Sequence, residues 1–279
     1  MAKEKFLILG ASSFYGNAFA TYVEEKGDEA IRLSRPEFDI EEPGTYGKVW
    51  EHADACIVNF ISRSLVAESW DKPCDWAFTN FEALTGLVDF LNRKWKWRFI
   101  HVSTPEVYGN TRGWVSEKCH FNPSTPYAVS RAAADMMLMA YQRAYGFPAI
   151  ITRTANIYGE GQKEPRIIPL AIRHKQEKMA LPLHGGGTTV RSFIHVKDAC
   201  EATYLICKEG TPGETYHIST RHAMPISELV KLIGCKVGEP IPDRLGKDRS
   251  YLMDSTKVRA LGWTDKVRIT DWIAQWATN

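Results

Sequence analysis

Short runs of apolar residues alternate along the chain with longer stretches in which apolar residues recur at helical spacing. The short runs are rich in aliphatic and β-branched residues and predict buried strands, while the longer stretches predict helices. Strands are expected at 5–10, 30–34, 56–59, 99–103 and 149–153, and the clearest helices at 79–91 and 127–145. The alternation predicts the α/β fold class, with a doubly wound parallel sheet covered by helices.

The pattern changes after residue 162, where shorter and less regular elements follow. A helix is expected from residue 166, a strand and turn at 181–187, and a return to the core at 191–198. We therefore expect a dinucleotide-binding domain and a smaller, partly discontinuous C-terminal substrate lobe. The predicted domain covers 1–162 and continues at 186–208, and the predicted lobe covers 163–185 and 209–279.

The turn between the first strand and the first helix has the sequence G-A-S-S-F-Y-G at 10–16. Gly10 permits a tight turn and Gly16 allows the helix to pack closely on the strand, while the helix N-terminus presents free N–H groups to a pyrophosphate. Ser13 replaces the usual middle glycine, and its hydroxyl is able to donate to a phosphate. The turn predicts a Rossmann-type dinucleotide site built from Gly10, Ser12, Ser13, Phe14, Tyr15 and Gly16.

The second predicted strand ends at Ser34 and is followed by Arg35. NAD-binding folds usually have an acidic residue here, which binds the ribose 2′-hydroxyl. Without that carboxylate a 2′-phosphate is not repelled, and a hydroxyl with a guanidinium is able to hold it. The sequence therefore favours NADP, with NAD as the alternative, and Asn59 at the end of the 56–59 strand is assigned to the same cofactor site.

Two segments carry most of the chemistry: S-T-P-E-V-Y-G at 103–109 and P-Y-A-V-S-R at 126–131. Thr104 and Glu106 follow a predicted strand, at the sheet edge where open α/β folds bind ligands. Tyr127 begins a helix, and Arg131 lies one turn later on the same face. Because a nearby cation favours ionisation, we expect the pKa of Tyr127 to fall below its reference value of about 10, giving a base near neutral pH.

These segments resemble the extended short-chain dehydrogenase/reductase family, and most closely its nucleotide-sugar 4,6-dehydratases of the dTDP-glucose type, within the dehydratase and epimerase group. That group has S-T-D-E-V-Y-G followed by Y-x-x-x-K. This chain differs at Pro105, which replaces the aspartate, and at Arg131, which replaces the lysine. The segments N-I-Y-G at 156–159, R-S-F-I-H-V-K-D at 191–198 and D-R-L-G-K-D-R-S-Y-L-M-D at 243–254 extend the resemblance over nearly the whole chain.

The resemblance implies a catalytic role for Tyr127, Arg131, Thr104 and Glu106. Tyr127 would remove the proton of the sugar C4 hydroxyl while hydride passes to the nicotinamide, and Thr104 would hydrogen-bond the same oxygen. Glu106 would then remove the C5 proton made acidic by the new ketone. Proline has no titratable group, so the acid that assists loss of the C6 hydroxyl is missing at 105.

The resemblance also implies which residues bind the nucleotide sugar and the adenosine. Asp39 and Ile40 correspond to a pair beside the adenine, and Tyr127 and Arg131 contact the nicotinamide ribose. A homodimer is expected through helix 127–145 and the helix before it. The substrate is expected to contact Thr104, Pro105, Glu106, Asn156, Arg191 and Arg249.

Four functions remain open from the sequence. The first is a nucleotide-sugar dehydratase with altered proton handling. A decarboxylase also oxidises C4 and needs no acid for departing CO₂, which suits Pro105. A 4-epimerase has no use for a carboxylate at Glu106. The double replacement of Pro105 and Arg131 favours, as the alternative of another class, a catalytically weakened NADP-binding sensor or scaffold.

Composition narrows the remaining classes. The 35 basic and 33 acidic residues give a net charge of +2, so no electrostatic argument favours nucleic acid or an anionic membrane as a partner. Nothing near the start resembles a signal peptide, so a cytoplasmic location is expected. The six cysteines form no C-x-x-C pair and no cluster with histidine at zinc-like spacing, so no metal site is expected.

Overall fold

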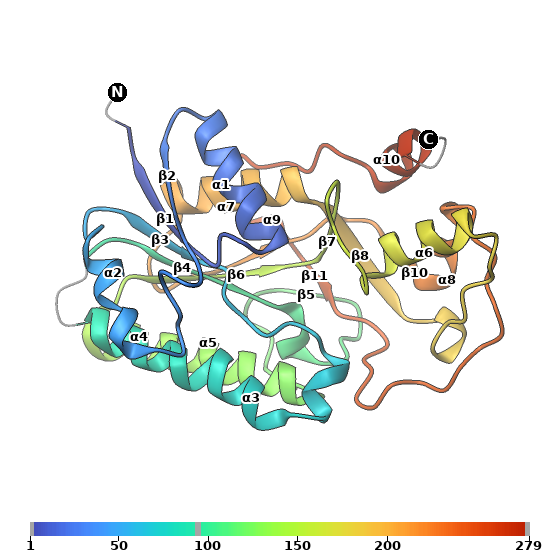
Figure 1. Ribbon diagram of the computed structural model, residues 1–279, viewed down its shortest axis with the longest axis horizontal. Coiled ribbons are helices and arrows are strands. Elements are labelled where there is room, and N and C mark those ends of the chain that lie inside the picture. Colours follow the sequence, from blue (N-terminus) through green and yellow to red (C-terminus); the bar gives the residue numbers. More distant parts are fainter. Residues whose placement is uncertain (1–2, 93–95, 277–279) are drawn as a thin grey trace.

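The computed structural model describes residues 3–92 and 96–276. Within them, six parallel strands form a central sheet in the order β2-β1-β3-β4-β6-β9 (Figure 1). Because β1 lies between β2 and β3, the strand order reverses there, and ligands of such sheets bind at the carboxyl ends beside the reversal. The strands are β1 (Lys5–Leu9), β2 (Glu29–Leu33), β3 (Cys56–Asn59), β4 (Phe99–Ser103), β6 (Ala149–Thr154) and β9 (Thr215–Ile218).

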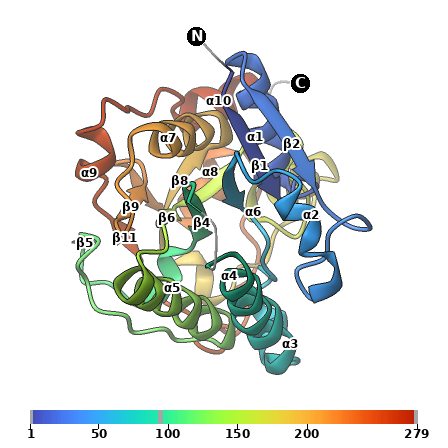
Figure 2. The same ribbon diagram turned by 90° about the vertical axis from the view of Figure 1, so that its left-hand side faces the viewer.

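Helices cover both faces of this sheet (Figure 2). On one face lie α1 (Phe14–Glu25) and α7 (Val196–Glu209), whose Phe19 and Ile206 belong to one buried apolar cluster. On the other face lie α2 (Gly47–Trp50), α3 (Pro73–Ala77), a π-helical turn η3 (Phe78–Ala83), α4 (Leu84–Asn92) and α5 (Pro126–Tyr145). Leu87 and Leu138 of α4 and α5 are fully buried in a second cluster. The α/β fold class and the doubly wound parallel sheet are therefore confirmed.

The smaller lobe lies beyond the carboxyl ends of the strands, at the right of Figure 1. Its sheet has the order β10-β8-β7, and Ile168, Leu229 and Trp272 belong to its own apolar core. The lobe contains β7 (Asn156–Tyr158), α6 (Ile167–Gln176), β8 (Val190–His195), β10 (Ala223–Pro225), α8 (Ile226–Leu232) and α10 (Ile269–Trp276).

Two short strands connect the C-terminal part of the chain to the loop after β4. They are β5 (Trp114–Val115) and β11 (Leu252–Met253), which pair in parallel, and α9 (Thr256–Arg259) follows them. The backbone of Ser250 also accepts a hydrogen bond of 2.9 Å from Thr111 N. These contacts bring residues 248–251 close to the loop that carries Glu106.

The boundaries of the lobe differ from those predicted. β9 lies inside the predicted lobe segment 209–279 but forms an edge of the central sheet, paired with β6. All four residues of its sequence, T-Y-H-I, are buried although two of them are polar. The strand is therefore not a continuous apolar run, which is the pattern that predicts a buried strand. The strand predicted at 181–187 is absent; Leu181 and His184 make only isolated bridges to 237 and 241, and a 3₁₀ turn η5 (Gly185–Gly187) follows.

In the described part of the chain, no helix is long and apolar enough to cross a membrane.

Candidate active site

Tyr127 is fixed at the start of α5 by the local sequence. Thr125 is the N-cap, and its hydroxyl accepts a hydrogen bond of 3.1 Å from the backbone N–H of Ala128. Pro126 occupies the first helical position, where its missing N–H leaves no bond unmade. The Tyr127 side chain is buried, and the Thr104 hydroxyl is close enough to lower the pKa of its phenol, so the sheet edge and the helix start meet at this pair.

Thr104 and Glu106 follow β4 as predicted, but in a short 3₁₀ helix η4 (Pro105–Tyr108). Thr104 caps it with an extended backbone, the geometry that a following proline imposes, and its hydroxyl accepts from Glu106 N at 3.3 Å. Pro105 itself is buried at the first position of the turn. Pro105 therefore holds the Thr104 hydroxyl in place even though it supplies no acid.

The pKa of Tyr127 is raised, which contradicts the expected shift. Burial disfavours the phenolate and is the largest cause; Arg131 lowers the pKa and the nearby Glu106 raises it. The cation predicted at position 131 is therefore present, but the loss of solvent outweighs it.

Arg131 is directed beneath Tyr127 into the sheet and is almost fully buried. One guanidinium nitrogen, Nη2, donates to the carbonyl of Val102 and lies 3.2 Å from His101 Nε2. The pKa of His101 is held well below its usual value by burial and by Arg131 and Arg153, so the imidazole is a neutral acceptor. The Nε and Nη1 atoms of Arg131 have no hydrogen-bond partner in the described structure. Two donors are thus free for a ligand.

Glu106 has the most unusual environment of the predicted site residues. Burial raises its pKa to about 7, Arg191 and Arg166 oppose that rise, and Asp248 adds to it. The phenol of Tyr251 lies beside Glu106 and lowers the pKa of its carboxyl group. A carboxyl group with a pKa near 7 is able both to accept and to return a proton at neutral pH.

Three of these neighbours were missed by the sequence analysis. Arg166 caps α6 and bonds Ser64 at 3.0 Å, Asp248 accepts from Ser124 at 2.8 Å, and Tyr251 is buried. They lie 60 to 145 residues from Glu106 in the sequence, so no local spacing links them to it. Only the resemblance of segment 243–254 pointed to this region.

The residues predicted to bind the nucleotide diphosphate are arranged unequally. The Arg191 guanidinium lies 3.9 Å from the ring centre of Tyr251 and donates to the carbonyls of Val190 and Asp248, each at 2.9 Å. Its charge acts on Glu106 and lowers the pKa of that carboxyl group. Asn156 begins β7 opposite Phe193 and is partly exposed, whereas Arg249 is exposed and contributes its backbone carbonyl to Arg191.

The glycine turn fits a dinucleotide. Gly10 has φ of +79°, and a Cβ placed on Gly16 would lie 2.5 Å from the Gly10 carbonyl oxygen. Only glycine therefore allows this close passage of helix and turn. Ser12 and Ser13 are exposed and Phe14 is partly exposed beside the N-terminus of α1. Together with the unpaired Nε and Nη1 atoms of Arg131, which suit the hydroxyls of a nicotinamide ribose, the turn fits NAD(P).

Two residues of the turn play roles other than those predicted. Ser13 is the N-cap of α1: its hydroxyl accepts from Gly16 N and donates to Gly10 O at 2.8 Å, so it is already engaged. The Tyr15 side chain enters the core between α1 and α7, where its hydroxyl contacts Thr203 at 2.6 Å and the Ala199 carbonyl. Tyr15 is thus able to offer a cofactor only its backbone.

The adenosine end of the predicted site contains paired charges. Arg35 is exposed but donates to Asp39 at 3.1 Å and lies 3.6 Å from Glu41. Ser34 is partly exposed beside it, while Ile40 is buried in the apolar cluster under α4.

Asn59 is also buried. Its Oδ1 accepts from Ile61 N at 3.0 Å, and its Nδ2 lies 3.4 Å from His101 Nδ1. The side chain therefore orders the end of β3 under the predicted site.

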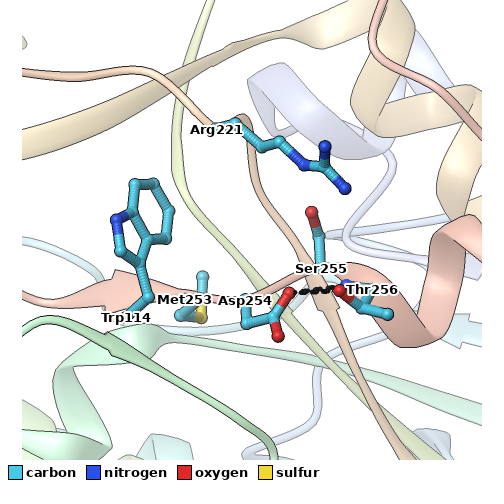
Figure 3. A pocket seen from close by; sticks show the side chains of 6 residues that line it. All are labelled: Trp114, Arg221, Met253, Asp254, Ser255 and Thr256. Atoms are coloured by element: carbon cyan, nitrogen blue, oxygen red, sulfur yellow. Dashed lines mark hydrogen bonds between the residues drawn. The ribbon is translucent and has the colours of Figure 1, made fainter.

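A separate cavity of about 310 Å³ lies between β11 and α9 (Figure 3). None of the predicted catalytic residues lines it; the lining residues are Trp114, Arg221, Met253, Asp254, Ser255 and Thr256. In the ranges 3–92 and 96–276, no group of three or more His, Cys, Asp or Glu side chains is placed to hold a metal ion.

The sheet reversal, the glycine turn and the Tyr127–Thr104–Glu106 group define the class of extended short-chain dehydrogenase/reductase enzymes. Residues 6–219 match the model of the NAD dependent epimerase/dehydratase family. A "Probable dTDP-glucose 4,6-dehydratase" from Sinorhizobium fredii is 36% identical over 308 residues, covering 93% of this chain and 87% of the relative. The chain belongs to the NAD dependent epimerase/dehydratase family, and it is an enzyme of the dehydratase and epimerase type.

Two further similarities support this assignment. "Low-salt glycan biosynthesis protein Agl12" from Haloferax volcanii is 30% identical over 286 residues, 92% of each chain. The crystal structure of DesIV, a dTDP-glucose 4,6-dehydratase from Streptomyces venezuelae with NAD bound, aligns with a TM-score of 0.90 at 29% identity, over 98% of this chain and 96% of that chain.

Proposed function

We propose that this enzyme dehydrates a nucleotide-diphosphate hexose, with transient oxidation at C4 and loss of water across C5 and C6. The observation that carries the proposal is Glu106, a carboxyl group with a pKa of about 7 that interacts with Tyr127 and Arg191. Simple epimerisation at C4 requires a proton to leave and return at the C4 oxygen and a hydride to leave and return at C4, and it has no use for this group.

In the proposed reaction each side chain has a different role, set by its position. A bound nicotinamide supplies the hydride acceptor and donor. Tyr127 takes the C4 hydroxyl proton, and Thr104, beside Tyr127, holds the same oxygen as it becomes a ketone. Glu106 removes the C5 proton, and Arg191, which never loses its charge, binds the diphosphate.

Arg131 acts below this group as a fixed cation. It offsets part of the burial that raises the pKa of Tyr127, and its free Nε and Nη1 donors suit ribose hydroxyls. Its guanidinium therefore takes over two tasks of the family lysine while anchored to the sheet through Val102.

A decarboxylase is the second candidate, because Pro105 supplies no acid and departing CO₂ needs none. The electrostatics favour the dehydratase. The pKa values of Glu106 and Asp248 are both raised, so a negative charge is already costly beside them, and a uronic acid substrate would add a third carboxylate. The positive charges of Arg166 and Arg191 would have to balance all three carboxylates.

The experiment is incubation of the purified protein with NAD or NADP and, in turn, dTDP-glucose, UDP-glucose and a UDP-uronic acid, followed by product mass. We expect loss of one water from a hexose. Loss of CO₂ from the uronic acid, or a shifted sugar peak without a mass change, would replace this function by decarboxylation or epimerisation. Tyr127→Phe is the matched control and is expected to give no product while retaining cofactor binding.

Ser34 and Arg35 support a preference for NADP over NAD. The 2′-phosphate would have to draw the guanidinium of Arg35 away from Asp39 and Glu41, so the two carboxylates work against this preference. Arg35 is exposed enough to turn toward a phosphate, and Ser34 is beside it. The balance between these contacts decides which of the two cofactors binds more tightly.

A homodimer through α5 and η3 is the assembly that the surface supports. Val129 and Met136 of α5 are each 52% exposed, and Phe78 and Phe81 of η3 are 41% and 37% exposed. α5 and η3 pack side by side, and their exposed apolar residues are called here the α5/η3 face. A second copy would cover this face. The division into a dinucleotide domain and a substrate lobe, and a cytoplasmic location, stay predictions.

A further inference from the structure

Dehydration needs a proton for the departing C6 oxygen, and the position that carries the family's acid is Pro105. The groups around Glu106 are therefore the places to look for a replacement. The titratable groups that interact with Glu106 are Arg166, Arg191, Tyr127, Asp248 and Tyr251. An arginine cannot give up a proton near neutral pH, and Tyr127 is engaged at C4.

Tyr251 is better placed than Asp248 among the remaining two. Its phenol is close enough to the Glu106 carboxyl group to stabilise the carboxylate as a hydrogen-bond donor, whereas Asp248 acts on Glu106 only through its charge. Asp248 is itself engaged, because its Oδ2 accepts from the Ser124 hydroxyl at 2.8 Å. Tyr251 is 8% exposed, so its proton has few partners other than Glu106 and a bound substrate.

The position of Tyr251 is fixed from three sides. The Arg191 guanidinium lies 3.9 Å from the centre of its ring. On the side before it, the Arg249 carbonyl accepts from Val190 N at 2.8 Å; on the side after it, Leu252 N donates to the Thr111 hydroxyl at 3.0 Å. A donor held this firmly meets the geometric demand of proton transfer.

We propose that Tyr251 protonates the departing C6 oxygen, in place of the carboxylic acid that is absent at Pro105, and that Glu106 restores the proton to Tyr251. The C5–H bond breaks, its proton goes to Glu106, and its electron pair forms the C5–C6 double bond. The C6–O bond breaks with its electron pair on oxygen, which takes the phenolic proton and leaves as water. The proton on Glu106 then passes to the neighbouring phenolate, so both residues end as they began.

This inference rests on the proposed dehydratase function. Tyr251→Phe tests it because phenylalanine keeps the ring under Arg191 and removes only the hydroxyl. With dTDP-glucose we expect cofactor reduction and exchange of the C5 hydrogen with deuterium oxide to continue at near the original rate. Water loss should fall by about 10²-fold or more, the usual contribution of a general acid. Tyr145→Phe, at an exposed tyrosine at the end of α5, is the control and should change nothing.

A substrate analogue separates proton donation from positioning. With the 6-deoxy-6-fluoro sugar the leaving group is fluoride, a far weaker base than hydroxide, so Tyr251→Phe should slow its loss little. The double variant Pro105→Asp/Tyr251→Phe should regain water loss from the normal sugar. If fluoride and hydroxide loss slow equally, or if oxidation fails together with elimination, the hydroxyl has a structural role and the proposal is overturned.

The remaining outcomes also decide. Two results would overturn the role of Tyr251 but not the dehydratase function. One is undiminished dehydration by Tyr251→Phe. The other is a larger defect in Asp248→Asn that is confined to water loss. Wild-type protein that removes water from neither dTDP-glucose nor UDP-glucose contradicts the dehydratase function itself. Should Tyr251→Phe fail to bind cofactor, Tyr251→His replaces it, and water loss must then decline as the pH rises past about 6.5, the pKa of an imidazole donor; a flat profile overturns the proposal.

Discussion

At the scale of single residues, the site depends on how burial and charge act together on Glu106 and Tyr127. Burial raises the pKa of both groups, but it brings Glu106 close to neutral and moves Tyr127 away from it. Glu106 is therefore the group whose protonation changes in the range where enzymes are usually assayed. Under the proposed function, Tyr127 must lose its own proton before it takes that of the substrate hydroxyl, and Arg131 is the charge that favours its phenolate.

The pH dependence of C5 proton removal follows from Glu106. The carboxylate is the active form, and with a pKa of about 7 its fraction grows as the pH rises from 6 to 8, rather than near the ordinary value of 4.5. We expect exchange of the C5 hydrogen with deuterium oxide to rise through about pH 7 and to be lost in Glu106→Gln. A rate already constant above pH 5, or exchange retained by the glutamine variant, would assign the base to another group.

Cofactor choice tests the charges around Arg35. Arg35→Ala should weaken NADP by about tenfold or more relative to NAD, since a hydrogen bond to a charged group contributes about 1.5–3 kcal/mol. Asp39→Asn should do the opposite, because it frees the guanidinium from its partner. Arg32→Ala, which removes an exposed arginine paired with Glu24, is the control. Calorimetric titration in which wild-type protein prefers NAD would reverse the predicted preference.

At the scale of elements, the site is positioned by how strands end and helices begin. Thr104 follows β4 and caps η4, Thr125 caps α5, and Ser13 caps α1, so the functional side chains lie at helix starts whose N–H groups are capped. These caps and strand ends were predictable, because the sequence within about ten residues determines them. The engagement of the Ser13 hydroxyl and the burial of Tyr15 depend on packing between elements, which local sequence does not contain.

The glycine turn provides a test at this scale. Gly16→Ala would place a Cβ 2.5 Å from the Gly10 carbonyl, so α1 must move away from the turn. We expect NAD(P) binding to weaken at least tenfold and the free energy of unfolding to fall by about 1–3 kcal/mol. Gly47→Ala, in α2, is the control: its Cβ would meet no atom within 4 Å, and stability should stay level or rise by up to about 1 kcal/mol. Calorimetry that finds both variants alike would contradict the role given to Gly16.

At the scale of the whole molecule, the C-terminal half of the chain completes the site. Residues 3–154 supply the sheet reversal, the glycine turn and Tyr127, which the apolar pattern and the motifs predicted. Arg166, Arg191 and Tyr251 reach Glu106 from the lobe and from the strand pair β5–β11. The sequence did not predict these contacts, because they join segments 60 to 145 residues apart. They also depend on the strand β9, whose buried residues include the polar Thr215 and His217.

The α5/η3 face makes a prediction about assembly. Met136→Glu would place a charge at the centre of an apolar surface between two copies, so we expect a shift from dimer to monomer. Leu232→Glu, at a residue 41% exposed on α8 of the lobe, should leave the dimer intact. Analytical ultracentrifugation at micromolar concentration measures both. A monomeric wild-type protein, or a Met136→Glu variant that stays dimeric, would rule out this face as the interface.

The most direct test of the central claim is the mass of the product formed from dTDP-glucose in deuterium oxide. If Glu106 removes the C5 proton while water leaves C6, the hexose of the product is lighter by one water and carries one solvent deuterium at C5. The Glu106→Gln variant should then form no such product while still reducing its cofactor. A product of unchanged mass, or one that has lost water without taking up deuterium at C5, would contradict the account.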